Sequence, residues 1–215
     1  MLRDLLDALR CPHPHAESWL VAVVHETDGL TLVAADLACP VCGAEFAIAE
    51  GVAYFGTPDV LAPPPQATFA DEPLRLAALL GVADGDTPVL LSGRYALAGN
   101  ALAELVNVPQ LWVNAPAEHR PSSPRTSQMI VGVQLPLGVA TLAAAALDVT
   151  DASEAMLESV MRAVKQGGRI VAPVSVPRPE ALKELARDER EWVAEVTTRA
   201  SGLIELRRRT PDAVG

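Results

Sequence analysis

The chain has 215 residues, 50% of them hydrophobic and only 4% aromatic, so its core must be built mainly from Ala, Val and Leu. Its formal net charge of −10 argues against binding a phosphate backbone, and we expect no nucleic-acid partner. No segment reaches the roughly 18 consecutive apolar residues of a membrane span, and the N-terminus lacks the features of a signal peptide. We therefore expect a cytoplasmic protein with no membrane contact.

The first 56 residues predict a small β-rich domain. Leucines at helical spacing predict a short amphipathic helix over residues 2–9, ending before Pro12. Two β-branched runs around an Asp-Gly turn predict a hairpin with strands over residues 19–25 and 30–34. The alternating run over residues 46–54 predicts a second, shorter hairpin.

Residues 57–69 are rich in proline, which predicts a semi-rigid linker. We place the N-terminal domain at 1–56 and a larger domain at 70–210.

The larger domain shows strand patterns that alternate with helical ones. Helices are predicted over residues 72–80, 97–105, 152–165 and 179–189. Strands are predicted over residues 88–91, 110–113, 129–134, 141–147, 169–174, 192–198 and 203–208. This alternation predicts an α/β fold of the Rossmann-like type, a mostly parallel sheet with helices on both faces.

A metal site is predicted in the N-terminal domain. Cys39 and Cys42 form a C-x-x-C knuckle, whose tight turn lets both sulfurs point at one ion, and Cys11 supplies a third thiolate. A second cysteine is expected near Cys11, but Pro14 stands there, so the fourth ligand must be His13 or His15. We favour His15, because its spacing from Cys11 gives the imidazole more room to reach back.

The alternative interpretation of this motif is a redox-active C-x-x-C. Such a motif would open a helix after a strand, whereas this one lies between two β segments. Four protein ligands would also leave no open position on zinc, so we predict a closed, structural Zn²⁺ site.

Three N-terminal stretches carry a family resemblance: Leu5-Leu6-x-x-Leu9-Arg10-Cys11-Pro12, Leu37-x-Cys39-Pro40-x-Cys42-Gly43 and Phe46-x-Ile48-x-x-Gly51-Val52-x-x-Phe55. Together they resemble the small zinc-ribbon activator subunit of tRNA and release-factor methyltransferases. The resemblance covers about the first quarter of the chain and departs from the family at Pro14. It implies a zinc ribbon that acts as a partner of a methyltransferase and has no catalytic role of its own.

Three stretches of the larger domain carry a second resemblance: Val89-Leu90-Leu91-Ser92-Gly93, Leu135-Pro136-Leu137 to Leu147-Asp148, and Met161-Arg162-x-Val164-Lys165-Gln166-Gly167-Gly168-Arg169-Ile170-Val171. Together they are similar to class I S-adenosylmethionine-dependent methyltransferases. The similarity implies a cofactor site made by a glycine-rich turn after the first strand and by acidic residues after the second and third.

This sequence departs from that cofactor pattern. Only Gly93 falls where a glycine is expected, and the turn carries the bulky side chains of Arg94, Tyr95 and Leu97. The second strand ends at Asn114 and offers no carboxylate, nor does the third. We expect Gly93 and Asn114 to be vestiges of a cofactor site, and S-adenosylmethionine to bind poorly or not at all.

The sequence therefore predicts a non-catalytic, methyltransferase-like scaffold that binds zinc and acts through a protein partner or a second copy of itself. The alternative is an active S-adenosylmethionine-dependent methyltransferase with a drifted cofactor site. We predict no catalytic residues. The sequence identifies neither a substrate nor a partner.

Overall fold

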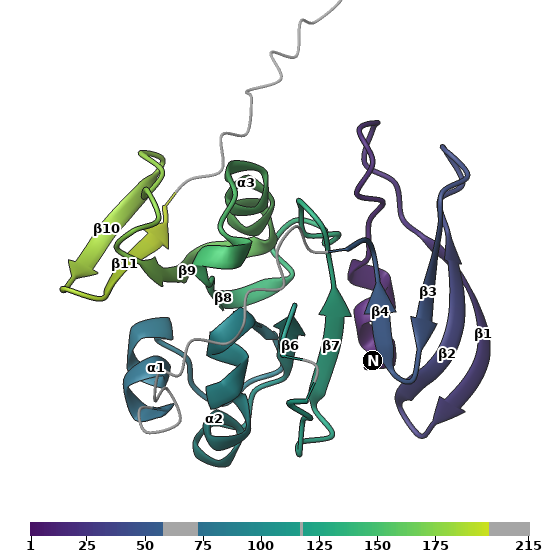
Figure 1. Ribbon diagram of the computed structural model, residues 1–215, viewed down its shortest axis with the longest axis horizontal. Helices are drawn as coiled ribbons and strands as arrows, with labels where there is room; N and C mark the ends of the chain where they lie inside the picture. The colour runs from purple at the N-terminus through teal and green to yellow at the C-terminus, as the bar shows by residue number, and fades with distance from the viewer. Residues whose placement is uncertain (58–72, 117, 198–215) are drawn as a thin grey trace, which may run out of the picture.

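The computed structural model describes residues 1–57, 73–116 and 118–197. All of its strands form one sheet in the order β1-β2-β3-β4-β7-β6-β5-β8-β9-β11-β10 (Figure 1). No helix among the described residues is long and apolar enough to cross a membrane.

The N-terminal part is a short helix followed by an antiparallel meander. The helix η1 (Arg3–Ala8) precedes β1 (Val21–Asp28), β2 (Thr31–Ala38), β3 (Glu45–Ala49) and β4 (Val52–Tyr54). Each strand pairs antiparallel with the next, so both predicted hairpins are confirmed. The predicted helix is a 3-10 helix of six residues, because β-bridges at Leu2 and Leu9 hold its two ends extended.

The larger part has the predicted mostly parallel sheet. The parallel strands are β5 (Val89–Ser92), β6 (Gln110–Val113), β7 (Thr126–Ile130), β8 (Leu142–Ala146) and β9 (Val164–Pro173). A hairpin of β10 (Leu182–Arg187) and β11 (Glu191–Val196) follows, with β11 antiparallel to β9. Numbered along the chain from β5, the order is 3-2-1-4-5-7-6. This arrangement confirms the expected methyltransferase-like Rossmann fold.

Helices cover both faces of this sheet. The helices α1 (Pro73–Leu80), η2 (Gly93–Ala98) and α2 (Gly99–Leu105) pack on one face, where Leu91 and Trp112 belong to the core. The opposite face carries Leu90, Leu111 and the helix α3 (Glu154–Ala163) in a second core. Adjacent strand residues enter opposite cores because side chains alternate across a strand.

The N-terminal meander is joined to the larger sheet through β4. This strand pairs parallel with β7, matching Val52 to Gln128 and Tyr54 to Ile130. Leu5, Leu9 and Ile48 from the N-terminal part share one core with Leu111 and Met129 from the larger part. The predicted linker falls mostly outside the described residues, and the division into two domains stays a prediction.

One predicted helix is wrong. Residues 179–189 were expected to be helical, but they contain strand β10, which pairs Leu182 with Val196 and Arg187 with Trp192. Helix-forming residues give only a weak preference, and pairing with β11 overrides it. The strand predicted over residues 203–208 lies outside the described residues.

Candidate functional site

The knuckle is a tight turn that follows β2 directly. The Gly43 N–H donates to the Cys39 carbonyl at 2.9 Å, and the Cys39 N–H donates to the Ala44 carbonyl at 2.8 Å. Gly43 has a φ of +71°, a left-handed conformation that glycine adopts without strain. The turn therefore places the Cys39 and Cys42 side chains on the same side of the chain.

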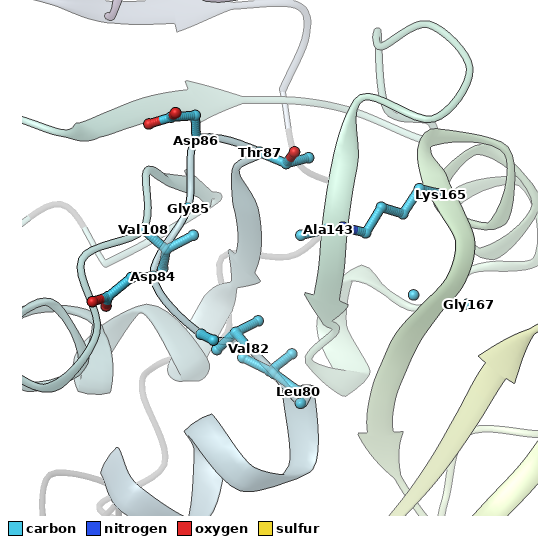
Figure 2. Close-up of a pocket in the computed structure, with 13 residues that line it drawn as sticks. Leu80, Val82, Asp84, Gly85, Asp86, Thr87, Val108, Ala143, Lys165 and Gly167 are labelled. Carbon is cyan, nitrogen blue, oxygen red and sulfur yellow. The ribbon is translucent and has the colours of Figure 1, made fainter.

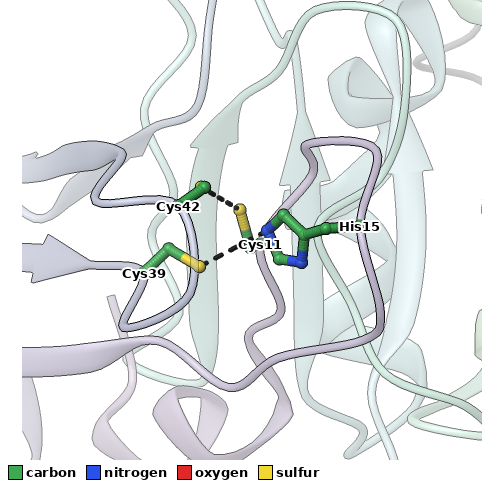
Figure 3. A group of neighbouring side chains, drawn as sticks. All are labelled: Cys11, His15, Cys39 and Cys42. Carbon is green, nitrogen blue, oxygen red and sulfur yellow. Dashed lines mark hydrogen bonds between the residues drawn. The ribbon is translucent and has the colours of Figure 1, made fainter.

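The segment after η1 brings the remaining groups to the knuckle. The Cys11 N–H donates to the Ser18 carbonyl at 3.0 Å, and the His15 N–H donates to the His13 carbonyl at 2.9 Å. These bonds close a short loop whose bend directs His15 back toward Cys11 (Figure 3). Two segments far apart in sequence thus meet at one point.

Cys11, His15, Cys39 and Cys42 form a cluster that could hold a metal ion. Their ligand atoms all lie within 4.8 Å of one another. The Cys11 and Cys42 Sγ atoms are 3.7 Å apart, and Cys39 Sγ lies 3.4 Å from His15 Nε2 (Figure 3). Zn–S bonds of about 2.3 Å and Zn–N bonds of about 2.0 Å give tetrahedral edges of roughly 3.8 and 3.5 Å. The donor set and its spacing therefore fit zinc.

His15 rather than His13 completes this cluster. His15 Nδ1 lies 2.6 Å from the Ala16 carbonyl oxygen, which can only accept, so Nδ1 carries the proton and Nε2 keeps its lone pair for a metal. His13 Nδ1 lies 3.7 Å from Cys42 Sγ, while its ring makes an edge contact with Phe46. His15, the ligand that we favoured from the sequence, therefore has a ring nitrogen free to bind a metal ion.

The thiols of the cluster are not equivalent. Burial opposes ionisation of Cys39, but the amides of Val41 and Cys42 outweigh it and lower its pKa to about 6. Burial and the neighbouring sulfurs raise the pKa of Cys11 to about 11. Without metal, Cys39 is therefore a thiolate at neutral pH, and a bound cation would have to displace the proton from Cys11.

Gly93 and Asn114 lie where the carboxyl ends of β5 and β6 meet, the edge at which open α/β sheets bind ligands. The space beside Gly93 is filled by Asp148, because a Cβ on Gly93 would lie 2.7 Å from Asp148 Oδ2. Asp148 is buried at the end of β8. It accepts a hydrogen bond from the Arg94 N–H at 2.9 Å, and its Oδ1 lies 3.2 Å from Arg94 Nε.

Several polar groups at this edge are hydrogen-bonded to one another. The Asn114 amide donates to Asp151 Oδ1 at 2.7 Å, and its oxygen accepts from the Val131 N–H at 2.9 Å. The Asp148 N–H donates to the Ser92 hydroxyl at 2.8 Å. We did not predict this network from the sequence, although two aspartates three residues apart, directly after a buried strand, were the signal for it.

Two neighbouring side chains are engaged away from Gly93. The Tyr95 hydroxyl donates to buried Glu191 on β11 at 2.8 Å. Helix α3 is capped by Ser153, which accepts from the Met156 N–H at 3.2 Å. Asp151 is free for the contact with Asn114 because η3 (Val149–Asp151) intervenes before α3.

Asp151 is a buried carboxyl with only one engaged oxygen. Its Oδ2 makes no hydrogen bond within the described residues. Burial, reinforced by the Asp148 charge, raises the pKa of Asp151 to about 6, although the hydrogen bond from Asn114 favours the charged form. Ionisation of Asp151 at neutral pH therefore lowers the stability of the folded state.

A cavity of about 370 Å³ opens at the opposite edge of the sheet, near the amino ends of β5 and β8 (Figure 2). Its lining includes Asp84, Asp86 and Lys165. Asp84 accepts from the Asn107 N–H at 2.8 Å, and Asp86 pairs with Arg125 at 2.9 Å. Both carboxylates are thus already engaged, and we assign this cavity no function.

No protein-family model matches the sequence, and no curated protein matches it either. Among solved structures, the chain is similar to the antibiotic-resistance methyltransferase Kmr, with 14% identity and a TM-score of 0.37 over 59% of this chain and 93% of that one. It is also similar to geranyl diphosphate C-methyltransferase from Streptomyces coelicolor A3(2), with 15% identity and a TM-score of 0.38. That match covers 55% of this chain and 54% of the other.

Structural similarity at these TM-scores does not define the fold class, so we assign the class from the strand order of the protein itself. The strand order defines a methyltransferase-like Rossmann fold, and its N-terminal extension carries a Cys/His cluster suited to a metal ion.

Proposed function

We propose that this protein is a zinc-stabilised, methyltransferase-like scaffold without catalytic activity. The observation that supports the proposal is the Asp148 carboxylate beside Gly93, whose Oδ2 lies 2.7 Å from the position that a Cβ on Gly93 would take, at the edge of the sheet where we expect a cofactor to approach. Arg94 holds that carboxylate in place through its backbone N–H and its guanidinium. A cofactor would have to displace a buried, ion-paired group before it could reach the backbone.

The residues at the carboxyl ends of the parallel strands also support weak cofactor binding. A carboxylate that accepts from a ribose hydroxyl or an adenine amine contributes roughly 1.5–3 kcal/mol. After β6 the chain offers Asn114, whose amide and carbonyl groups are both engaged within the protein. A ligand would therefore lose these contacts and also break existing hydrogen bonds.

The metal site has a structural role in this proposal. All four ligand positions are filled by side chains, which is typical of zinc sites that stabilise a fold. The parallel pairing of β4 with β7 supports an activator-like ribbon held against its methyltransferase-like domain within one chain. The ribbon would then stabilise that domain by extending its sheet.

Thermal unfolding of the zinc-loaded chain tests the proposal. A ligand present at about 1,000 times its Kd stabilises the native state by about 4 kcal/mol, so 1 mM S-adenosylmethionine would raise the Tm clearly if a micromolar site existed. We expect no change in Tm with S-adenosylmethionine or S-adenosylhomocysteine. A concentration-dependent rise with either compound would favour the active methyltransferase instead.

A further inference from the structure

The connection from β9 to β10 lacks the helix that usually covers such a crossover. The two strands run parallel with β11 between them, and only residues 174–181 join Pro173 to Leu182. A parallel crossover normally takes a dozen or more residues and contains a helix. The face of the sheet next to α3 is therefore covered by an extended loop at this position (Figure 1).

A groove of about 490 Å³ lies between α3 and this loop. Its apolar lining comes from Leu157 and Met161 on α3 and from Pro177 and Pro179 on the loop. Leu157 and Met161 are one helical turn apart, so they form a stripe along α3. The groove thus has one apolar wall on a helix and a second on the loop.

The rim of the groove is acidic. Glu154 and Glu158 are exposed on α3, four residues apart, and Glu180 lies on the loop across from them. Within the part of the chain that the structure describes, none of these three carboxylates forms an ion pair. Arg178 also lines the groove, but it is held by Glu184 at 2.9 Å and by the Pro179 carbonyl at 3.0 Å. Like charges four residues apart destabilise a helix, so a cation between them would be stabilising.

We infer that this groove binds a basic amphipathic helix of a protein partner, which takes the place of the missing crossover helix. Apolar side chains at spacings of three and four residues would contact Leu157, Met161 and the prolines. Lysine or arginine side chains flanking them would pair with Glu154, Glu158 and Glu180. This inference holds whether or not the cofactor site is functional.

Fluorescence anisotropy with the full, zinc-loaded chain tests the inference. The probe is a labelled designed peptide of about 14 residues, with leucines on one helical face and lysines beside them, forming a helix of roughly 21 Å. We expect saturable binding, which Glu158→Lys weakens by about tenfold because it reverses a rim charge. The matched control is Glu104→Lys, which reverses the charge of an exposed glutamate on α2 and should leave the affinity unchanged.

Two further measurements identify where the peptide binds. Amide chemical shifts should move on α3 and residues 177–181, and a peptide with every lysine replaced by glutamate should not bind. Absence of binding, or equal loss with Glu158→Lys and Glu104→Lys, would overturn the inference. It would also be overturned by a dimer that Glu158→Lys dissociates in sedimentation, since a second copy would then occupy the groove.

Discussion

His13 and His15 are two residues apart, yet their ring nitrogens have different surroundings. His15 Nδ1 faces the Ala16 carbonyl at 2.6 Å, which frees Nε2 for the thiolates, whereas His13 Nδ1 lies 3.7 Å from Cys42 Sγ. We predict that His15→Ala abolishes stoichiometric zinc binding, whereas His13→Ala retains close to one zinc per chain. Elemental analysis after dialysis against a mild chelator measures this, and loss of zinc in His13→Ala alone would reverse the assignment.

Loss of metal should also loosen the ribbon, because structural zinc sites couple binding to folding. We predict that Cys39→Ser lowers the Tm and removes zinc together. A variant that binds no zinc and still unfolds at the wild-type temperature would show that the metal has no structural role.

Asp151 gives a prediction about pH. Its folded-state pKa is raised from 3.8 to about 6, so the stability that its protonation provides is fully present below about pH 4 and lost as the pH rises through 6. Asp151→Asn mimics the neutral form and should gain roughly 1–3 kcal/mol at pH 8 but little near pH 4. Urea unfolding at both pH values measures the difference, and an equal gain at each would argue against a titrating Asp151.

At the scale of elements, the N-terminal helix connects the two parts of the chain. Leu9 follows η1, is fully buried and forms a β-bridge with Leu137. We predict that Leu9→Ala costs about 2–5 kcal/mol of unfolding free energy, measured with urea. Leu74→Ala is the control, because Leu74 is 71% exposed on α1 and should change stability by less than about 0.5 kcal/mol. Equal effects of the two substitutions would contradict the packing described here.

Hydrophobic periodicity and turn residues are local patterns, and they allowed most helices and strands to be predicted. Contacts between residues far apart in the sequence could not be predicted from them. The candidate metal cluster could be predicted because the Cys39 knuckle is a short-range motif and residue type limited the fourth ligand to two histidines. Asp148 against Gly93 joins residues 55 positions apart, and no local pattern encodes that contact. The prediction of a helix over residues 179–189 was wrong for the same reason. Pairing with β11, and not the local sequence, makes β10 extended.

At the scale of the whole molecule, one sheet and one shared core connect the metal cluster to the Rossmann part. We predict that the two parts unfold in one transition, so zinc release and loss of far-UV circular dichroism coincide during thermal unfolding. A chromophoric chelator reports the first signal in the same sample. Zinc release well before loss of secondary structure would show that the ribbon unfolds independently.

We propose that this methyltransferase-like fold does not accommodate S-adenosylmethionine. Two missing carboxylate contacts together cost roughly 3–6 kcal/mol, which weakens binding by about two to four orders of magnitude. Isothermal titration calorimetry of S-adenosylmethionine into the zinc-loaded chain measures this directly. We predict no saturable heat at ligand concentrations up to about 1 mM, whereas a one-site isotherm with micromolar Kd would show that the cofactor site is functional.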